Sequence, residues 1–229
     1  MALALAAREE LNVHVLHDER AASFVALGIG RIDRVPAALL CTSGTAATHF
    51  HGAVVEAHLS GVPMLVLTAD RPPELRDVGA PQTIDQTRLY GPVARWYHDP
   101  GVPSADVTGS WRGLARHAFA ESMGVNPGPV HLNLPFREPL VGRAGTLPAA
   151  TLGGFERSTS SASVGAVVPV LDHQRGVVVA GAGVDDPDAV ARLAEVLGWP
   201  VLADPRSDLR GRPGVVAAFD GLLRDPAFA

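Results

Sequence analysis

The chain of 229 residues contains one cysteine, Cys41, and only 5% aromatic residues. A single cysteine excludes a framework of internal disulfides and favours a reducing compartment, so we expect a cytoplasmic protein. Charged residues are also sparse, at 19%, and the net charge of -5 comes without a cluster of lysine and arginine. Because nucleic-acid binding depends on concentrated positive charge, we expect no nucleic-acid partner.

Long hydrophobic runs are missing as well. Residues 1–10 have no basic leader and reach acidic residues after a few apolar ones, which predicts neither a signal peptide nor a membrane span. The chain is rich instead in short aliphatic segments, since 47% of its residues are hydrophobic and most of these are alanine, valine and leucine. This composition suits a parallel sheet covered by helices.

Apolar runs alternate with helical patterns in the first part of the chain. Strands are predicted at 11–16, 37–41, 62–67 and 130–134, and helices at about 19–31, 45–59 and 110–123, with Asp18 as the first N-cap. The rhythm of strand, turn, helix and strand predicts an α/β fold with a parallel sheet flanked by helices. After Pro72 and Pro73, residues 74–92 predict a long loop with short helical pieces.

A break near residue 150 separates two such regions. Residues 141–163 are rich in small residues and show little periodicity, so we expect a first domain over 1–150, a linker over 151–163 and a second α/β domain over 164–229. In that domain, strands at 176–180 and 200–203 flank a helix at 187–197. The turn Gly181-Ala-Gly183 resembles a dinucleotide fingerprint, but Asp186 takes the place of its third glycine, which favours a plain strand-to-helix turn.

Polar clusters follow three of the predicted strands. They are Asp18-Glu19-Arg20, the turn Thr42-Ser43-Gly44-Thr45, and residues 68–82, which contain Arg71 and Gln82. Since the carboxyl ends of parallel strands meet at one edge of a sheet, we expect a functional site at that edge.

From the residues alone, structural interpretations of these clusters remain open. Glu19 is also a plain helix N-terminal acid, and Ser43 and Thr45 are typical capping residues. Arg71 is equally suited to an ion pair with a neighbouring acid, Asp70 or Glu74. The nine histidines show no spacing typical of metal ligands, so we expect no metal site in these residues.

Together the clusters resemble one family, the thiamine-diphosphate-dependent 2-succinyl-5-enolpyruvyl-6-hydroxy-3-cyclohexene-1-carboxylate synthases of menaquinone biosynthesis. The resemblance is carried by Asp18-Glu19-Arg20, by TSGTA at 42–46, by LTADRPPEL at 67–75 and by GAPQ at 79–82, with weaker similarity at 131–139 and 176–200. TSGT alone indicates only the wider thiamine-diphosphate class. TADRPPEL leading into GAPQ is typical of this synthase.

The resemblance implies a pyrimidine-binding domain followed by the start of a central domain, in an enzyme that works as a dimer or a dimer of dimers. It implies that Glu19 hydrogen-bonds the aminopyrimidine of thiamine diphosphate and promotes removal of the thiazolium C2 proton. Ser43, Gly44 and Thr45 would lie against the cofactor. Arg71 and Gln82 would contact the substrates, 2-oxoglutarate and isochorismate.

The chain departs from the family at both ends and at His49, where asparagine is usual. A PGSRS-type turn before residues 2–7 and a downstream GDG motif, which holds the diphosphate through Mg²⁺ or Mn²⁺, are not found. We therefore expect a truncated chain that lacks its first strand and is inactive alone, with the metal bound through the missing C-terminal domain. The alternatives are a fragment of another thiamine-diphosphate decarboxylase or acetolactate-type synthase, or a non-catalytic α/β remnant with a binding or regulatory role.

Overall fold

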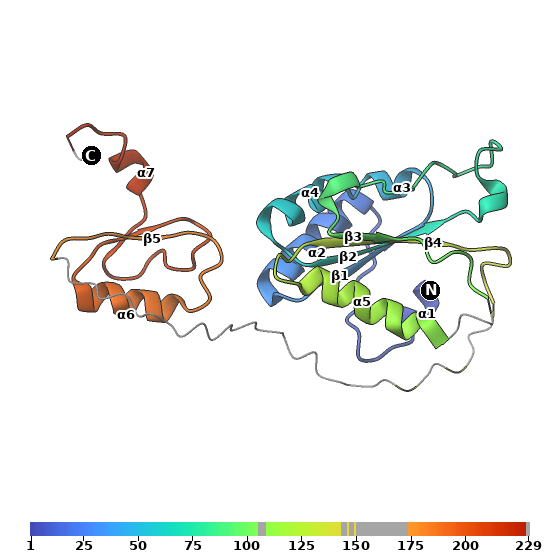
Figure 1. The fold of residues 1–229 in the computed structure, drawn as a ribbon, viewed down its shortest axis with the longest axis horizontal. Coiled ribbons are helices and arrows are strands. Elements are labelled where there is room, and N and C mark those ends of the chain that lie inside the picture. Colours follow the sequence, from blue (N-terminus) through green and yellow to red (C-terminus); the bar gives the residue numbers. More distant parts are fainter. Residues whose placement is uncertain (105–108, 143–145, 147–148, 150–173, 228–229) are drawn as a thin grey trace. The chain divides into compact units, whose positions relative to one another are not determined.

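The computed structural model describes residues 1–104, 109–142, 146, 149 and 174–227. The chain folds into two compact units, residues 1–162 and 163–229, which Figure 1 colours from blue to yellow and from orange to red. The linker predicted at 151–163 lies outside the described residues. No helix in the described part of the chain combines the length and the apolar character needed to cross a membrane.

The first unit is built on a four-stranded sheet with the order β1-β2-β4-β3. Its strands are β1 (Ala37–Cys41), β2 (Met64–Asp70), β3 (Trp96–His98) and β4 (Pro129–Pro135). Every pairing is parallel, with Cys41 of β1 opposite Thr68 and Thr68 opposite Asn133 of β4. The predicted α/β class with a parallel sheet is confirmed, and the carboxyl ends of β1, β2 and β4 share one edge.

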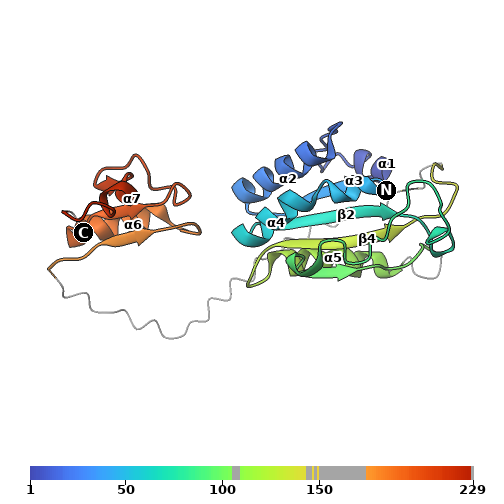
Figure 2. The same cartoon turned by 90° about the horizontal axis from the view of Figure 1, so that it is seen from above.

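Helices cover both faces of this sheet (Figure 2). The helices α2 (Glu19–Asp33), α3 (Thr45–Thr48) and α4 (His51–Ser60) lie on one face, and α5 (Trp111–Met123) lies on the other. An apolar cluster that includes Phe50, Val54 and Met64 fills the first interface. A second cluster, which includes Ala118 and Val130, lies under α5. The short helices α1 (Ala2–Ala6), η1 (Pro73–Leu75) and η2 (Gly91–Val93) complete the unit.

The predicted strand at 11–16 is wrong. These residues are exposed and pair with no strand of the sheet, and Val15 is 85% accessible. Their alternation of apolar and polar side chains meets the local requirement of a strand, but a strand also needs a neighbour for its backbone hydrogen bonds. The helix predicted over 45–59 is interrupted at His49 and Phe50, which separate α3 from α4.

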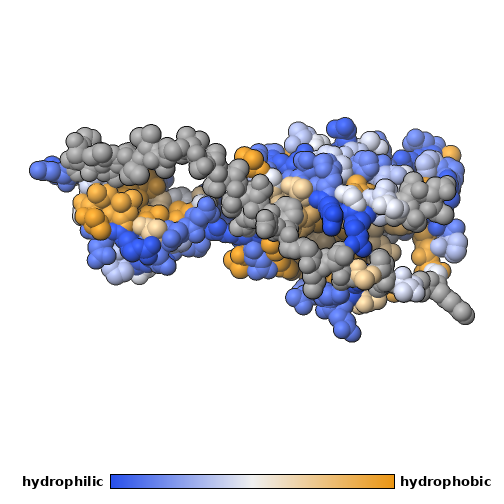
Figure 3. All heavy atoms as spheres, turned by 60° about the horizontal axis from the view of Figure 1, so that its bottom comes forward, coloured by the Kyte–Doolittle hydropathy of each residue, from blue (hydrophilic) through white to orange (hydrophobic). Residues whose placement is uncertain are grey.

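The second unit has a three-stranded parallel sheet with the order β5-β6-β7. It comprises β5 (Val178–Ala180), α6 (Pro187–Leu197), β6 (Val201–Ala203), β7 (Val215–Val216) and α7 (Phe219–Leu222). Its core includes Ala180, Val201 and Leu209. Apolar and hydrophilic residues both reach the surface of the units in Figure 3, and Val179 and Val196 are exposed in the second.

Candidate functional site

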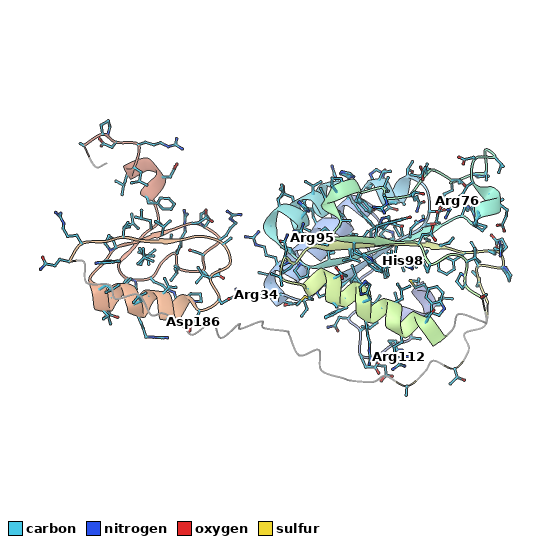
Figure 4. The ribbon with its side chains drawn as sticks, viewed as in Figure 1. Arg34, Arg76, Arg95, His98, Arg112 and Asp186 are labelled. Carbon is cyan, nitrogen blue, oxygen red and sulfur yellow. The ribbon has the colours of Figure 1, made fainter. Side chains whose placement is uncertain are left out.

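The carboxyl ends of β1 and β2 carry most of the predicted site residues. The turn after β1, residues 42–45, stands beside the end of β2 because Cys41 pairs with Thr68. The long loop after β2 then returns toward this turn. Figure 4 labels Arg76 at this end of the sheet and Arg95 at the opposite end, where Arg95 Nη2 donates to the Pro127 carbonyl.

Ser43 and Gln82 are joined by hydrogen bonds in both directions. Ser43 Oγ donates to the Gln82 carbonyl oxygen at 3.0 Å, and Gln82 Nε2 donates to Thr42 Oγ1 at 2.8 Å and to the Ser43 carbonyl oxygen at 3.3 Å. Gly44 has φ +82°, and a Cβ added there would lie 3.1 Å from Gln82. The left-handed backbone and the close contact both require glycine at this turn. The structure therefore brings Ser43, Gly44 and Gln82 together.

A buried polar network lies beside this turn, and sequence reasoning missed it. Gln86 Oε1 accepts a hydrogen bond from the Gly44 N–H at 2.8 Å, and Gln86 Nε2 donates to Asn133 Oδ1 at 2.9 Å. Thr68 Oγ1 donates to the same Asn133 oxygen at 2.9 Å, and His131 Nε2 lies 2.8 Å from Thr68 Oγ1. The available signal was a set of polar residues inside otherwise apolar strands, Thr68 in β2 and His131 and Asn133 in β4, all of which are buried.

Asp70 extends the network to the start of the loop. Its Oδ1 accepts from the Arg71 backbone N–H at 2.7 Å, and its Oδ2 accepts from Arg76 Nη2 and Asn133 Nδ2, each at 2.8 Å. Arg76 Nη2 also reaches Asp99 Oδ2 at 3.1 Å. Partial burial acts to lower the pKa of the Arg76 guanidinium, but the bonds to the two carboxylates outweigh it and raise that pKa. Both carboxylate oxygens of Asp70 are thus engaged by protein groups.

Arg71 does not form the ion pair considered from the sequence. Asp70 and Glu74 pair with other arginines. Arg71 Nη2 donates to the Pro81 carbonyl oxygen at 3.3 Å, next to Gln82, while Arg71 Nε is buried without a hydrogen-bond partner among the described residues. The guanidinium therefore keeps donors that are not used by the surrounding protein.

Glu19 lies near the end of β1, at the beginning of α2. The N-cap of this helix is Asp18, whose Oδ1 accepts from the Ala21 N–H at 2.7 Å, as predicted. The Glu19 carboxylate makes no hydrogen bond or ion pair within the described part of the chain. Burial, aided by the negative charge of Glu19, raises the pKa of the Cys41 thiol to about 12, which makes Cys41 a buried apolar residue rather than a nucleophile.

Thr45 and His49 are less involved. Both are exposed, and within the described part of the chain neither side chain hydrogen-bonds Ser43, Gln82 or Arg71. In residues 1–104, 109–142 and 174–227, no group of three or more His, Cys, Asp and Glu side chains is arranged to hold a metal ion. In the second unit, Asp186 Oδ1 accepts from the Ala189 N–H at 2.8 Å, so the protein's own carboxylate occupies the N-terminus of α6.

Comparisons with known proteins point to the family indicated by the strand-end clusters. Residues 1–89 match the N-terminal TPP binding domain of thiamine pyrophosphate enzymes, and residues 156–229 match a family described as the middle domain of thiamine pyrophosphate. The chain is 45% identical over 237 residues to the 2-succinyl-5-enolpyruvyl-6-hydroxy-3-cyclohexene-1-carboxylate synthase of Thermobifida fusca, covering 100% of this chain and 43% of that protein.

The synthase of the same name from Geobacillus thermodenitrificans is 42% identical over 260 residues, which cover 100% of this chain and 42% of that protein. The chain therefore spans less than half the length of these relatives. The two domain matches and these identities confirm the resemblance found in the sequence. This chain is a homologue of the 2-succinyl-5-enolpyruvyl-6-hydroxy-3-cyclohexene-1-carboxylate synthases, and its two matched regions are similar to the N-terminal and middle domains of thiamine pyrophosphate enzymes.

Proposed function

We propose that this chain forms the pyrimidine-binding part of a synthase that decarboxylates 2-oxoglutarate and adds the resulting acyl-anion equivalent to isochorismate. The observation that carries the proposal is the gathering of Ser43, Gln82 and Arg71 at the edge formed by β1 and β2, with Glu19 near the end of β1. The name shared by the relatives supports this reaction.

The residues at this edge fit the aminopyrimidine of thiamine diphosphate. The Glu19 carboxylate has no partner of its own among the described residues, so it is free to share a proton with a ring nitrogen. The Ser43 hydroxyl and the Gly44 N–H are already engaged by Gln82 and Gln86. They would therefore serve the cofactor by shaping the turn, while the exposed Thr45 hydroxyl remains open to a ligand.

Each protein group has a separate task in the proposed reaction. When bound, thiamine diphosphate supplies the electron sink for decarboxylation. Glu19 would hold a proton at the pyrimidine ring. The unused donors of Arg71 would bind a carboxylate, a group that both substrates carry, and Gln82 would place the substrate beside it.

The remaining parts of the site follow from the family. The diphosphate and its Mg²⁺ or Mn²⁺ would be held by the diphosphate-binding domain of the family, outside the two regions matched here. The active enzyme would be a homodimer, or a dimer of dimers, that works in the cytoplasm.

A chimera tests the proposal. This chain replaces the aligned region of the Thermobifida fusca synthase, which then supplies the rest of the enzyme. With Mg²⁺ and thiamine diphosphate, the chimera is expected to release CO₂ from 2-oxoglutarate and to consume isochorismate. Glu19→Gln should lower kcat by about 100-fold or more, because the proton can no longer be shared. The matched change at an exposed acid, Glu9→Gln, should leave kcat unchanged.

The outcomes of this experiment separate the alternatives. An active Glu19→Gln chimera would contradict the role of Glu19. Release of CO₂ without consumption of isochorismate would favour another 2-oxoacid decarboxylase. A chimera that does not bind thiamine diphosphate would favour a non-catalytic remnant.

A further inference from the structure

Gln86 lies where three neighbouring strands end, and its amide uses all of its hydrogen-bonding groups. The side chain is 1% exposed. Its Oε1 accepts from the Gly44 N–H at 2.8 Å, and its Nε2 donates to the Ala69 carbonyl oxygen and to Asn133 Oδ1, each at 2.9 Å. These partners belong to the turn after β1, to β2 and to β4. One side chain from the long loop thus connects three strands.

The direction of this amide is fixed by its partners. The Gly44 N–H can only donate and the Ala69 carbonyl can only accept, so a reversed amide would lose both bonds. Asn133 is fixed in the same way, because its Oδ1 also accepts from Thr68 Oγ1 and its Nδ2 donates to Asp70 Oδ2. The network therefore has a single arrangement of donors and acceptors.

This network connects the two halves of the proposed site. From Gly44 it runs through Gln86 and Asn133 to Asp70, whose Oδ1 accepts from the Arg71 backbone N–H at 2.7 Å. The members are buried, and a buried polar group left without its partner is costly. The turn at 43–45 and the backbone of Arg71 are thus held by one continuous series of bonds.

We infer that Gln86 is a positioning residue, which fixes the turn at 43–45 relative to Arg71 and so sets the spacing between the cofactor-binding and substrate-binding groups. Gln86 acts through Gly44 and Asn133 and does not itself touch either ligand. The effect on ligand binding rests on the proposed function. The effect on the geometry of the turn does not.

Two substitutions separate positioning from general stability. Gln86→Met keeps the length of the side chain but removes the acceptor for the Gly44 N–H. Gln86→Glu keeps that acceptor but buries a carboxylate against the Ala69 carbonyl and Asn133 Oδ1, which offer it no hydrogen. The Glu variant should therefore lose more stability than the Met variant. The Met variant, in contrast, should make the turn at Gly44 more mobile, because the Gly44 N–H loses its acceptor.

The first measurement is the hydrogen-exchange rate of the Gly44 amide, which NMR detects in the full chain without ligand. The amide of Gly30, inside α2, serves as the internal reference for each sample. Relative to Gly30, exchange at Gly44 should be about tenfold faster in Gln86→Met and within about threefold of wild type in Gln86→Glu. The same two changes at the exposed Gln174 should alter neither amide.

The second measurement is the affinity for thiamine diphosphate in the chimera with the Thermobifida fusca synthase. Gln86→Met should weaken binding about tenfold, which corresponds to about 1.4 kcal/mol. Gln86→Glu should weaken it less, although it is the less stable protein. If Gln86→Glu fails to fold, the comparison of Gln86→Met with wild type still decides the result.

The outcomes distinguish the two proposals. Unchanged exchange at Gly44 in Gln86→Met overturns the inference, whether or not a ligand binds. Affinities that follow stability, with Glu weaker than Met, also overturn it, because Gln86 would then be merely structural. If the wild-type chimera binds no thiamine diphosphate while Gly44 exchange responds as expected, the proposed function fails and the positioning of the turn is supported.

Discussion

His131 is a buried titratable residue inside β4. Its Nε2 lies 2.8 Å from Thr68 Oγ1, whose own hydrogen goes to Asn133 Oδ1, so Nε2 carries the histidine hydrogen. Its Nδ1 is buried and has no partner in the described residues. Burial lowers the pKa of His131 to about 4, against a smaller opposing effect of Asp99. The folded protein therefore keeps this side chain neutral.

Stability should consequently fall as the pH drops from 6.5, the ordinary pKa of histidine, toward about 4. Over this range the unfolded chain takes up a proton at His131 and the folded chain does not, so acid favours unfolding. Urea unfolding of wild type and His131→Gln measures this effect. The wild-type advantage in unfolding free energy should shrink by about 2 kcal/mol between about pH 7.5 and about pH 4.5. An advantage independent of pH would contradict the assignment.

Among the secondary-structure elements, α2 contains two glycines in opposite surroundings. Gly28 is exposed, and an added Cβ would meet nothing within 4 Å, whereas at Gly30 it would lie 2.6 Å from the Pro63 carbonyl oxygen. Gly28→Ala should raise the unfolding free energy by about 0.5–1 kcal/mol, because alanine favours a helix. Gly30→Ala should lower it by about 1–3 kcal/mol, because the backbone must shift. Chemical denaturation monitored by circular dichroism measures both, and changes of the same sign would contradict this explanation.

Elements whose ends carry local signals could be predicted more accurately than elements that depend on distant partners. The prediction of α6 is correct to the residue, because Asp186, Pro187 and Gly198 are local signals for its ends. The strand at 11–16 is wrong and β3 and β7 were not predicted, because strand formation depends on partners far away in the sequence. Sequence pattern alone does not contain that information.

The same distinction between local signals and distant partners applies to the residues of the candidate site. The rule that parallel strands end at one edge predicted that Ser43, Arg71 and Gln82 belong to one region. It included Glu19 through the strand predicted at 11–16, which the structure does not contain, and the resemblance supplied the proposed roles of these residues. The roles of these residues, and of Gly44 and Thr45, stay predictions. The network around Gln86 could not be predicted, because its bonds join side chains up to 65 positions apart.

For the whole molecule, the separate cores of the two units have a measurable consequence. Phe50 in the first unit and Leu209 in the second are each fully buried in their own apolar cluster. We expect two thermal transitions in calorimetry. Phe50→Ala should destabilise only the first unit, by about 3–5 kcal/mol, and Leu209→Ala only the second, by about 2–5 kcal/mol. Equal shifts of both transitions by either variant would show that the units unfold together.

The bonds of Gln82 and Gln86 also constrain the length of the chain between them. Gln82 hydrogen-bonds Thr42 and Gln86 hydrogen-bonds Gly44, so the three residues between these glutamines are held at both ends. Most surface loops accept insertions and deletions. Here, inserting or deleting one residue between these glutamines would break the hydrogen bond of one of them. This segment should therefore tolerate substitutions far better than changes of length.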